Sequence, residues 1–144
     1  MPTDSSLAPF GLFVQTCCAM FLLAAGILTS ANAQPAPPRE WTSPPPGDIA
    51  RGRALYQARC TACHAVDGNK IGPAHRGVMG RRVGSLPGYQ YSEELARSRL
   101  RWTPQTLNAW LEDPEQLVAG QRMGFQVESA AERADLIAYL ATLK

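Results

Sequence analysis

The chain has 144 residues, of which 45% are hydrophobic and 18% are charged, and its formal net charge is +2. This length accommodates one domain of ordinary size. The balanced charge excludes a disordered acidic chain and a strongly basic nucleic-acid-binding protein, so we expect no nucleic-acid partner.

The N-terminal quarter of the sequence does not have a globular pattern. Residues 7–28 are nearly all apolar, and an Ala-Asn-Ala cleavage signal follows at residues 31–33. We interpret residues 1–33 as a secretory signal peptide. The alternative is an uncleaved N-terminal membrane anchor, because the apolar stretch approaches spanning length and no Lys or Arg precedes it. Cys17 and Cys18 lie inside this segment.

A proline-rich linker follows, since six of the fourteen residues 34–47 are proline. Proline lacks a backbone N–H and fixes φ, so this segment cannot form a helix and favours an extended polyproline geometry. The globular domain is therefore predicted to span residues 48–144.

Three helices of this domain are predicted from their capping residues. Asp48 is a suitable N-cap for the first helix. Ser92 precedes a short second helix that has two glutamates in its first turn, where negative charge is favourable. Thr103 followed by Pro104 marks the start of a third, because proline is preferred at the first helical position.

The last helix has the clearest pattern. Ser129 and Glu132 match a capping box, and three leucines follow at helical spacing: Leu136, Leu140 and Leu143. Between residues 68 and 91, by contrast, eight residues are Gly or Pro, which predicts a long loop. No strand alternation stands out, so the fold class is predicted to be all-α, with about four to five helices and long loops.

The chemistry of the chain is concentrated in the motif Cys-Thr-Ala-Cys-His at residues 60–64. On a helix, residues i, i+3 and i+4 share one face. Two thiols with this spacing can reach the two vinyl groups on one edge of a porphyrin, and His64 can then reach the iron. The motif is the attachment signature of a c-type haem, so one covalent haem c with its iron is the predicted cofactor.

Other uses of Cys60 and Cys63 fit the chain less well. A thioredoxin-like redox pair needs a βαβ setting, of which the sequence gives no sign. A structural zinc site needs four ligands, but beyond residue 33 the chain has no other cysteine and only His75 besides His64. A disulfide at this spacing would be strained.

Residues 48–144 resemble a class I cytochrome c, the soluble one-haem type of bacteria and mitochondria. The resemblance extends along the whole domain and rests, besides the haem motif, on Gly52, Tyr56, residues 70–73, Gly80, Arg81, residues 87–92, Trp102, residues 120–125 and residues 135–140. It implies the small cytochrome c fold, in which the first and last helices cross at a close contact and long loops wrap around the haem.

The resemblance also implies the haem site. His64 and Met123 would be the two axial ligands of the iron, a pairing that raises the reduction potential. Met79, the other methionine of the domain, is expected to pack in the core. The Pro73 carbonyl would accept the second ring N–H of His64. The further haem-binding residues are Arg81, Tyr91 and Trp102, as candidates to satisfy a buried propionate, together with Trp110 and Phe125.

Five positions depart from the family pattern. Trp110 stands where a tyrosine usually donates to the methionine sulfur, and Gln121 replaces a small hydroxyl residue. Ala119 replaces a proline that stiffens the methionine loop, His75 replaces a leucine near the haem, and Leu95 replaces a polar amide. These departures leave the strength of the Met–iron bond and the reduction potential open.

With both faces of the iron occupied, the resemblance implies one-electron transfer and no catalysis. We expect a monomeric electron carrier of a periplasmic respiratory or related redox chain that exchanges electrons with oxidoreductase complexes, free in the periplasm or anchored to the inner membrane. The alternatives are a dedicated haem relay subunit of a dehydrogenase or oxidase complex and, if Met123 does not bind iron, a haem protein that reacts with gases or peroxide.

The lysine ring that steers acidic partners in many relatives is interrupted in this chain. The matching positions include Glu115, Gln116 and Glu128, which leaves Arg59 and Arg122 as isolated positive charges. The sequence therefore predicts weak electrostatic steering of the partner.

Overall fold

The structure is a computed structural model that describes residues 43–144, so the predicted segment 1–33 and most of the predicted linker lie outside the described residues. The described chain forms five helices: α1 (Ile49–Arg59), α2 (Glu93–Arg97), α3 (Pro104–Glu112), α4 (Pro114–Leu117) and α5 (Ala130–Leu140). Its only strand-like feature is an isolated bridge between Arg82 and Arg101. The all-α prediction is confirmed, and residues 43–144 contain no helix of the length and apolarity needed to cross a membrane.

The predicted capping residues begin their helices. The Asp48 carboxylate accepts the Arg51 N–H at 2.8 Å, and the Ser92 hydroxyl accepts from the N–H of Leu95 at 3.3 Å. Thr103 likewise caps α3. The short α4 was not predicted, although Asp113 followed by Pro114 has the same cap-and-proline signature as the start of α3. Four residues are too few to show an apolar period.

The capping box predicted for α5 is half wrong. The Ser129 hydroxyl does accept the Glu132 N–H at 3.3 Å. The Glu132 side chain, however, does not return to the backbone of Ser129; it accepts two hydrogen bonds from the Arg59 guanidinium, at 2.7 and 3.0 Å. The two N–H donors of the guanidinium match the two carboxylate oxygens, so the pair is bidentate. The helix also ends at Leu140, so Leu143 packs against the core from beyond it.

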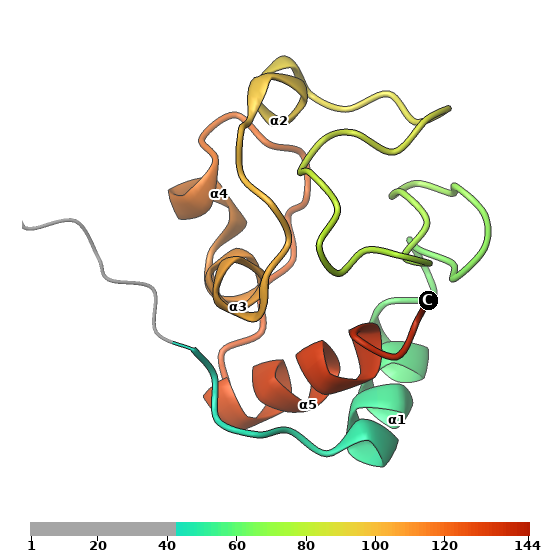
Figure 1. Ribbon diagram of the computed structural model, residues 1–144, viewed down its shortest axis with the longest axis vertical. Helices are drawn as coiled ribbons and strands as arrows, with labels where there is room; N and C mark the ends of the chain where they lie inside the picture. Colours follow the sequence, from blue (N-terminus) through green and yellow to red (C-terminus); the bar gives the residue numbers. More distant parts are fainter. Residues whose placement is uncertain (1–42) are drawn as a thin grey trace, which may run out of the picture. The chain divides into compact units, whose positions relative to one another are not determined.

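Helices α1 and α5 cross at a close contact, at the end of the domain opposite α2 (Figure 1). A Cβ atom placed on Gly52 would lie 1.9 Å from the Asp135 carbonyl oxygen, so only glycine permits this approach. One turn further on, the rings of Tyr56 and Tyr139 pack with their centroids 5.3 Å apart. The crossing implied by the sequence is confirmed.

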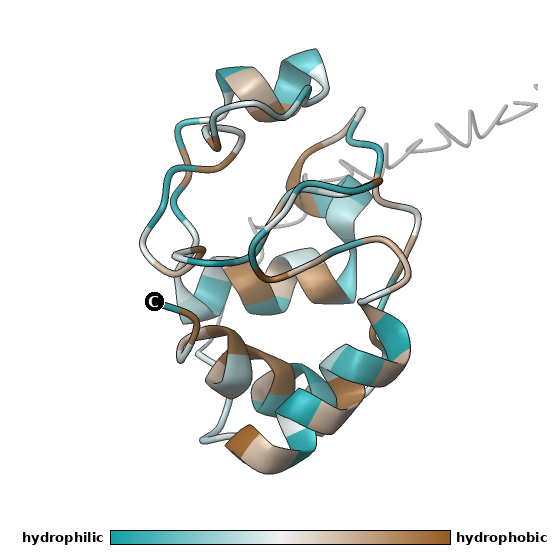
Figure 2. Ribbon diagram, turned by 90° about the vertical axis from the view of Figure 1, so that its right-hand side faces the viewer, coloured by the Kyte–Doolittle hydropathy of each residue, from teal (hydrophilic) through white to brown (hydrophobic). Residues whose placement is uncertain are grey.

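The core consists of two clusters. The larger lies between α1, α3 and α5 and contains Tyr56, Val78, Leu107, Leu111, Val127, Leu136, Ile137 and Leu140. The smaller contains Val83, Leu95 and Trp110, so Leu95 contributes apolar packing. The helices carry polar as well as apolar residues along their length (Figure 2). Met123 and Trp102 pack against both clusters and mark the region between them.

Candidate haem site

The two cysteines lie in a turn that continues the end of α1. The sequence predicted the motif on a helix; α1 instead ends at Arg59 and Cys60 is its C-cap. The His64 N–H still donates to the Cys60 carbonyl at 2.8 Å, which is the i to i+4 bond of a helical turn. The spacing that brings both thiols and His64 together is therefore preserved. Cys60 is half-buried and Cys63 is exposed, and the two form no disulfide with each other.

The acidity of Cys60 separates this motif from a redox pair. Burial raises the pKa of the Cys60 thiol to about 11. Reactive C-x-x-C pairs need the opposite change, since their attacking thiol has a lowered pKa. The all-α fold of residues 43–144 also lacks the βαβ setting of a thioredoxin-like pair, so the structure does not support that alternative.

His64 is held in a fixed orientation. Its Nδ1 lies 2.8 Å from the Pro73 carbonyl oxygen, which leaves Nε2 as the ring nitrogen that can bind a metal. Burial lowers the pKa of His64, which favours the neutral imidazole that metals require. A Cβ on Gly72 would lie 2.1 Å from the His64 ring, so the residue before Pro73 must be glycine. Sequence reasoning matched this glycine to the family without finding its role.

His75 lies on the same side of the site as His64. The two rings stack, with centroids 4.2 Å apart and an interplanar angle of 19°. Nδ1 of His75 is 3.1 Å from the Tyr56 hydroxyl. Burial, with smaller contributions from the neighbouring His64 and Arg81, lowers the pKa of His75 to about 3, so its ring is neutral. A ring stacked on His64 cannot reach the opposite face of the same iron.

Met123 is the methionine that a specific hydrogen bond holds in place. Its sulfur accepts the indole N–H of Trp110 at 3.1 Å. Trp110 is buried and packs edge to face on Trp102, with centroids 5.4 Å apart. The loss of the usual tyrosine hydroxyl is thus offset by the indole N–H. Met79 packs against the larger core cluster, as expected for a packing methionine.

Arg81 has an unsatisfied buried nitrogen. Its two terminal nitrogens donate to the Arg76 and Ala74 carbonyls, at 2.9 and 3.0 Å. Its Nε is buried without a hydrogen-bond partner within residues 43–144. Burial lowers the pKa of this guanidinium, with the nearby Tyr91 acting in the other direction. A buried unpaired donor requires an explanation, and an anionic group such as a haem propionate supplies one.

The remaining predicted residues lie around this region. Burial raises the pKa of the Tyr91 hydroxyl, and Tyr91 packs against the smaller cluster. Trp102 pairs through its backbone with Gly80 and Arg81. Phe125 is 38% exposed beyond the Met123 loop. Within residues 43–144, two adjacent thiols, a neutral imidazole, a fixed thioether and a buried arginine nitrogen without a partner together fit a haem c.

The outer face of the Met123 loop carries the charges considered for docking. A pocket of about 240 Å³ on this face is lined by Asp113, Pro114, Glu115, Gln121, Met123, Gly124 and Gln126. Glu115 and Arg122 are exposed. Arg59 is not the isolated charge that the sequence predicted, because Glu132 pairs with it. That pairing weakens the positive character of this surface further.

Comparison with known proteins places these features in one family. The family model for cytochrome c matches residues 49–144. Cytochrome c2 of Rhodopila globiformis is 45% identical over 105 residues, covering 71% of this chain and 99% of that protein. Cytochrome c of Gibberella zeae is 43% identical over 98 residues, covering 65% and 92% of the two chains.

Solved structures agree in fold. Cytochrome cH from Methylobacterium extorquens superposes with a TM-score of 0.64 at 39% identity, covering 67% of this chain and 99% of that one. Ferricytochrome c2 from Rhodopseudomonas palustris gives a TM-score of 0.63 at 33% identity, with the same coverage.

Proposed function

This chain belongs to the cytochrome c family, and we propose that it is a periplasmic electron carrier whose haem iron is held between His64 and Met123. As a cytochrome c it carries one covalent haem c, transfers electrons and is not an enzyme. When bound, the haem supplies a one-electron couple between ferrous and ferric iron.

Each residue of the site has a role in this electron carrier. Cys60 and Cys63 bind the haem covalently, and the Pro73 carbonyl orients His64 so that Nε2 is available to the iron. Arg81, with Tyr91 and Trp102, satisfies the propionates. Trp110 and Phe125 contribute to the apolar surroundings, which exclude water and help to set the reduction potential. None of these residues acts as a general base or a nucleophile.

The observation that carries the His/Met assignment is the hydrogen bond from the Trp110 indole to the Met123 sulfur. A thioether in a core is usually held by packing alone. Here a buried donor fixes the position of the sulfur and one of its lone pairs, and the second lone pair remains to bind iron. Met79 has no such partner within the described residues and lies among apolar side chains.

Substitution of the two methionines tests this assignment. We expect Met123→Ala to abolish the far-red sulfur-to-iron absorption of the ferric protein. It should also lower the reduction potential by on the order of 0.1 V, within the roughly 0.8 V range that axial ligands control, because a soft ligand that favours ferrous iron is lost. Met79→Ala is the matched control and should keep both properties. An unchanged spectrum and potential in Met123→Ala would refute the assignment.

The periplasmic location is supported by the bacterial cytochromes c2 and cH among the similar proteins and by the predicted secretory segment at residues 1–33. N-terminal analysis of the mature protein tests it. A mature chain that begins near Gln34 is the result expected for a free carrier, whereas an intact N-terminus in the membrane fraction would indicate an anchored relay.

A further inference from the structure

A tight turn precedes Met123. The Gln121 N–H donates to the Val118 carbonyl at 3.3 Å, and Gly120, the third residue of this turn, has φ +83°. This is the arrangement of a type II turn, in which proline is favoured at the second position because it fixes φ there. The second position is occupied by Ala119, which imposes no such restriction. The backbone of the Met123 loop therefore lacks one common source of stiffness.

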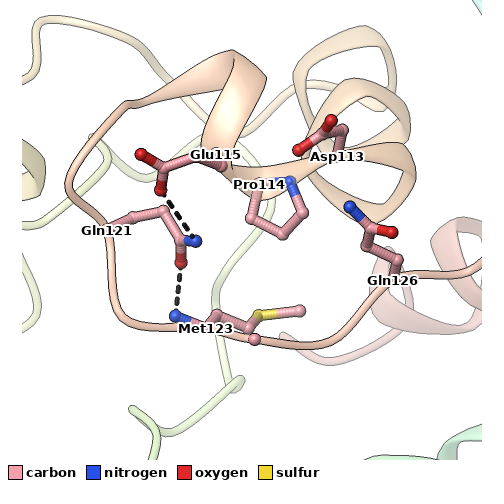
Figure 3. Close-up of a pocket in the computed structure, with 7 residues that line it drawn as sticks. Asp113, Pro114, Glu115, Gln121, Met123 and Gln126 are labelled. Carbon is pink, nitrogen blue, oxygen red and sulfur yellow. Dashed lines mark hydrogen bonds between the residues drawn. The ribbon is translucent and has the colours of Figure 1, made fainter.

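Side chains connect this turn to α4 and to Met123. The Glu115 carboxylate accepts the Gly120 N–H at 2.8 Å, and its other oxygen accepts from the Gln121 amide at 3.4 Å. The carbonyl oxygen of that amide accepts the Met123 N–H. Figure 3 shows Glu115, Gln121 and the Met123 backbone in sequence, linked by two of these bonds. A continuous chain of hydrogen bonds thus runs from α4 to the backbone of Met123.

We propose that Glu115 and Gln121 are positioning residues that hold the Met123 loop closed and so determine how often Met123 leaves the iron. This inference rests on the proposed ligation by Met123. The carboxylate replaces the constraint that proline would give to the turn, and the glutamine transmits it to the residue that carries the sulfur. A hydrogen bond to a carboxylate is stronger than one to a neutral acceptor. The Glu115 carboxylate can therefore hold the turn even though water reaches it.

The two residues act on the loop and not on the fold. Neither belongs to either core cluster, and Glu115 is exposed. A loop of this kind opens as a local unit, with a free energy well below that of global unfolding. Loss of the clamp is therefore expected to change the opening of the loop much more than the stability of the domain.

The opening rate can be measured by ligand replacement. Ferric protein is mixed with imidazole, and loss of the far-red sulfur-to-iron absorption is followed. At saturating imidazole the rate is limited by departure of Met123 from the iron. We expect Glu115→Ala and Gln121→Leu each to raise this limiting rate about tenfold, the factor expected from one charge-assisted or well-placed hydrogen bond. The denaturant midpoint should change little in either variant.

A rescue variant distinguishes positioning from a general loss of packing. Val118 already has an extended backbone, with φ −142° and ψ 95°, and so lies outside the α region that a following proline disfavours. We expect Ala119→Pro, added to Glu115→Ala, to return the limiting rate to within about threefold of the parent protein, since the turn regains a fixed φ. Glu93→Ala is the control for charge, because it removes an exposed carboxylate whose one ion pair within residues 43–144 is with Arg97.

The outcomes separate the two proposals. A far-red absorption in the parent protein, with limiting rates of Glu115→Ala and Gln121→Leu within twofold of the parent, would overturn the clamp and leave Met123 as a ligand. A rate in Glu115→Ala that Ala119→Pro does not reduce, or an equal acceleration in Glu93→Ala, would also overturn it. Absence of the absorption in the parent protein would refute ligation by Met123 itself.

Discussion

The indole N–H of Trp110 donates to the sulfur of Met123 at 3.1 Å. Trp110 is 8% exposed and is fixed by its edge-to-face contact with Trp102, so the donor cannot readily turn away from the sulfur. A donor at this position withdraws electron density from the thioether. The sulfur then donates less to ferric iron, which favours the ferrous state.

Trp110→Phe should therefore lower the reduction potential. Loss of one neutral hydrogen bond, about 0.5–1.5 kcal/mol, corresponds to a fall of up to roughly 60 mV for a one-electron couple. Trp110→Tyr is the matched control, because its hydroxyl can also donate, and its potential should lie nearer to that of the parent protein. Voltammetry of the three proteins provides the comparison. A potential in Trp110→Phe at or above the parent value would contradict this account.

Attachment of the haem depends on two thiols. Beyond residue 33 the chain contains only Cys60 and Cys63, so the double substitution Cys60→Ala, Cys63→Ala should abolish covalent haem. Each single substitution should retain one thioether link. Acid–acetone extraction followed by measurement of protein-bound haem tests both statements. Haem that resists extraction in the double variant would mean that another residue forms the covalent link.

Asp135 stabilises the crossing of α1 and α5 in a pH-dependent manner. Its carboxylate accepts from the Arg51 guanidinium at 2.8 Å and from the Asp48 N–H at 2.6 Å. The hydrogen bond from Arg51 is the main reason why the pKa of Asp135 is lowered. Because the folded-state pKa lies below the unfolded value of about 3.9, the stabilisation is complete above that value. It is lost as the pH falls through the folded-state pKa.

Asp135→Asn should thus lower the thermal midpoint at neutral pH, with a difference from the parent protein that shrinks as the pH falls below about 4. Calorimetry across a pH series measures this convergence. Glu128→Gln removes an exposed carboxylate and should show a much smaller difference throughout. A difference for Asp135→Asn that stays constant with pH would show that the carboxylate contributes through packing alone.

Electron transfer to the native partner should depend only weakly on salt. The outer face of the Met123 loop, which carries the charges considered for docking, has Glu115 and Glu128 among its exposed side chains. Because Arg59 is paired with Glu132, Arg122 has no strong positive neighbour among the described residues there to attract an acidic partner. Exposed charges are screened beyond about 8–10 Å at ordinary ionic strength. The measurement is the second-order rate over a salt series. A tenfold or greater fall would reveal strong steering and contradict the prediction.

The sequence alone determined the local structure of this protein. Asp48, Ser92 and Thr103 begin their helices as predicted, since an N-cap bonds a backbone N–H only two or three residues away. The haem motif is equally local, because its spacing brings the two thiols and His64 together within one turn. The glycines and prolines of residues 68–91 likewise predicted the long loop correctly.

Only the tertiary structure decided which distant side chains meet. Glu132 was expected to cap its own helix and instead pairs with Arg59 of α1, 73 residues away. The donor to Met123 lies 13 residues away on α3, and the clamp on its loop begins at Glu115 of α4, a helix that was not predicted. Such contacts depend on how the helices pack against one another, and the spacing of residues along the chain does not encode that arrangement.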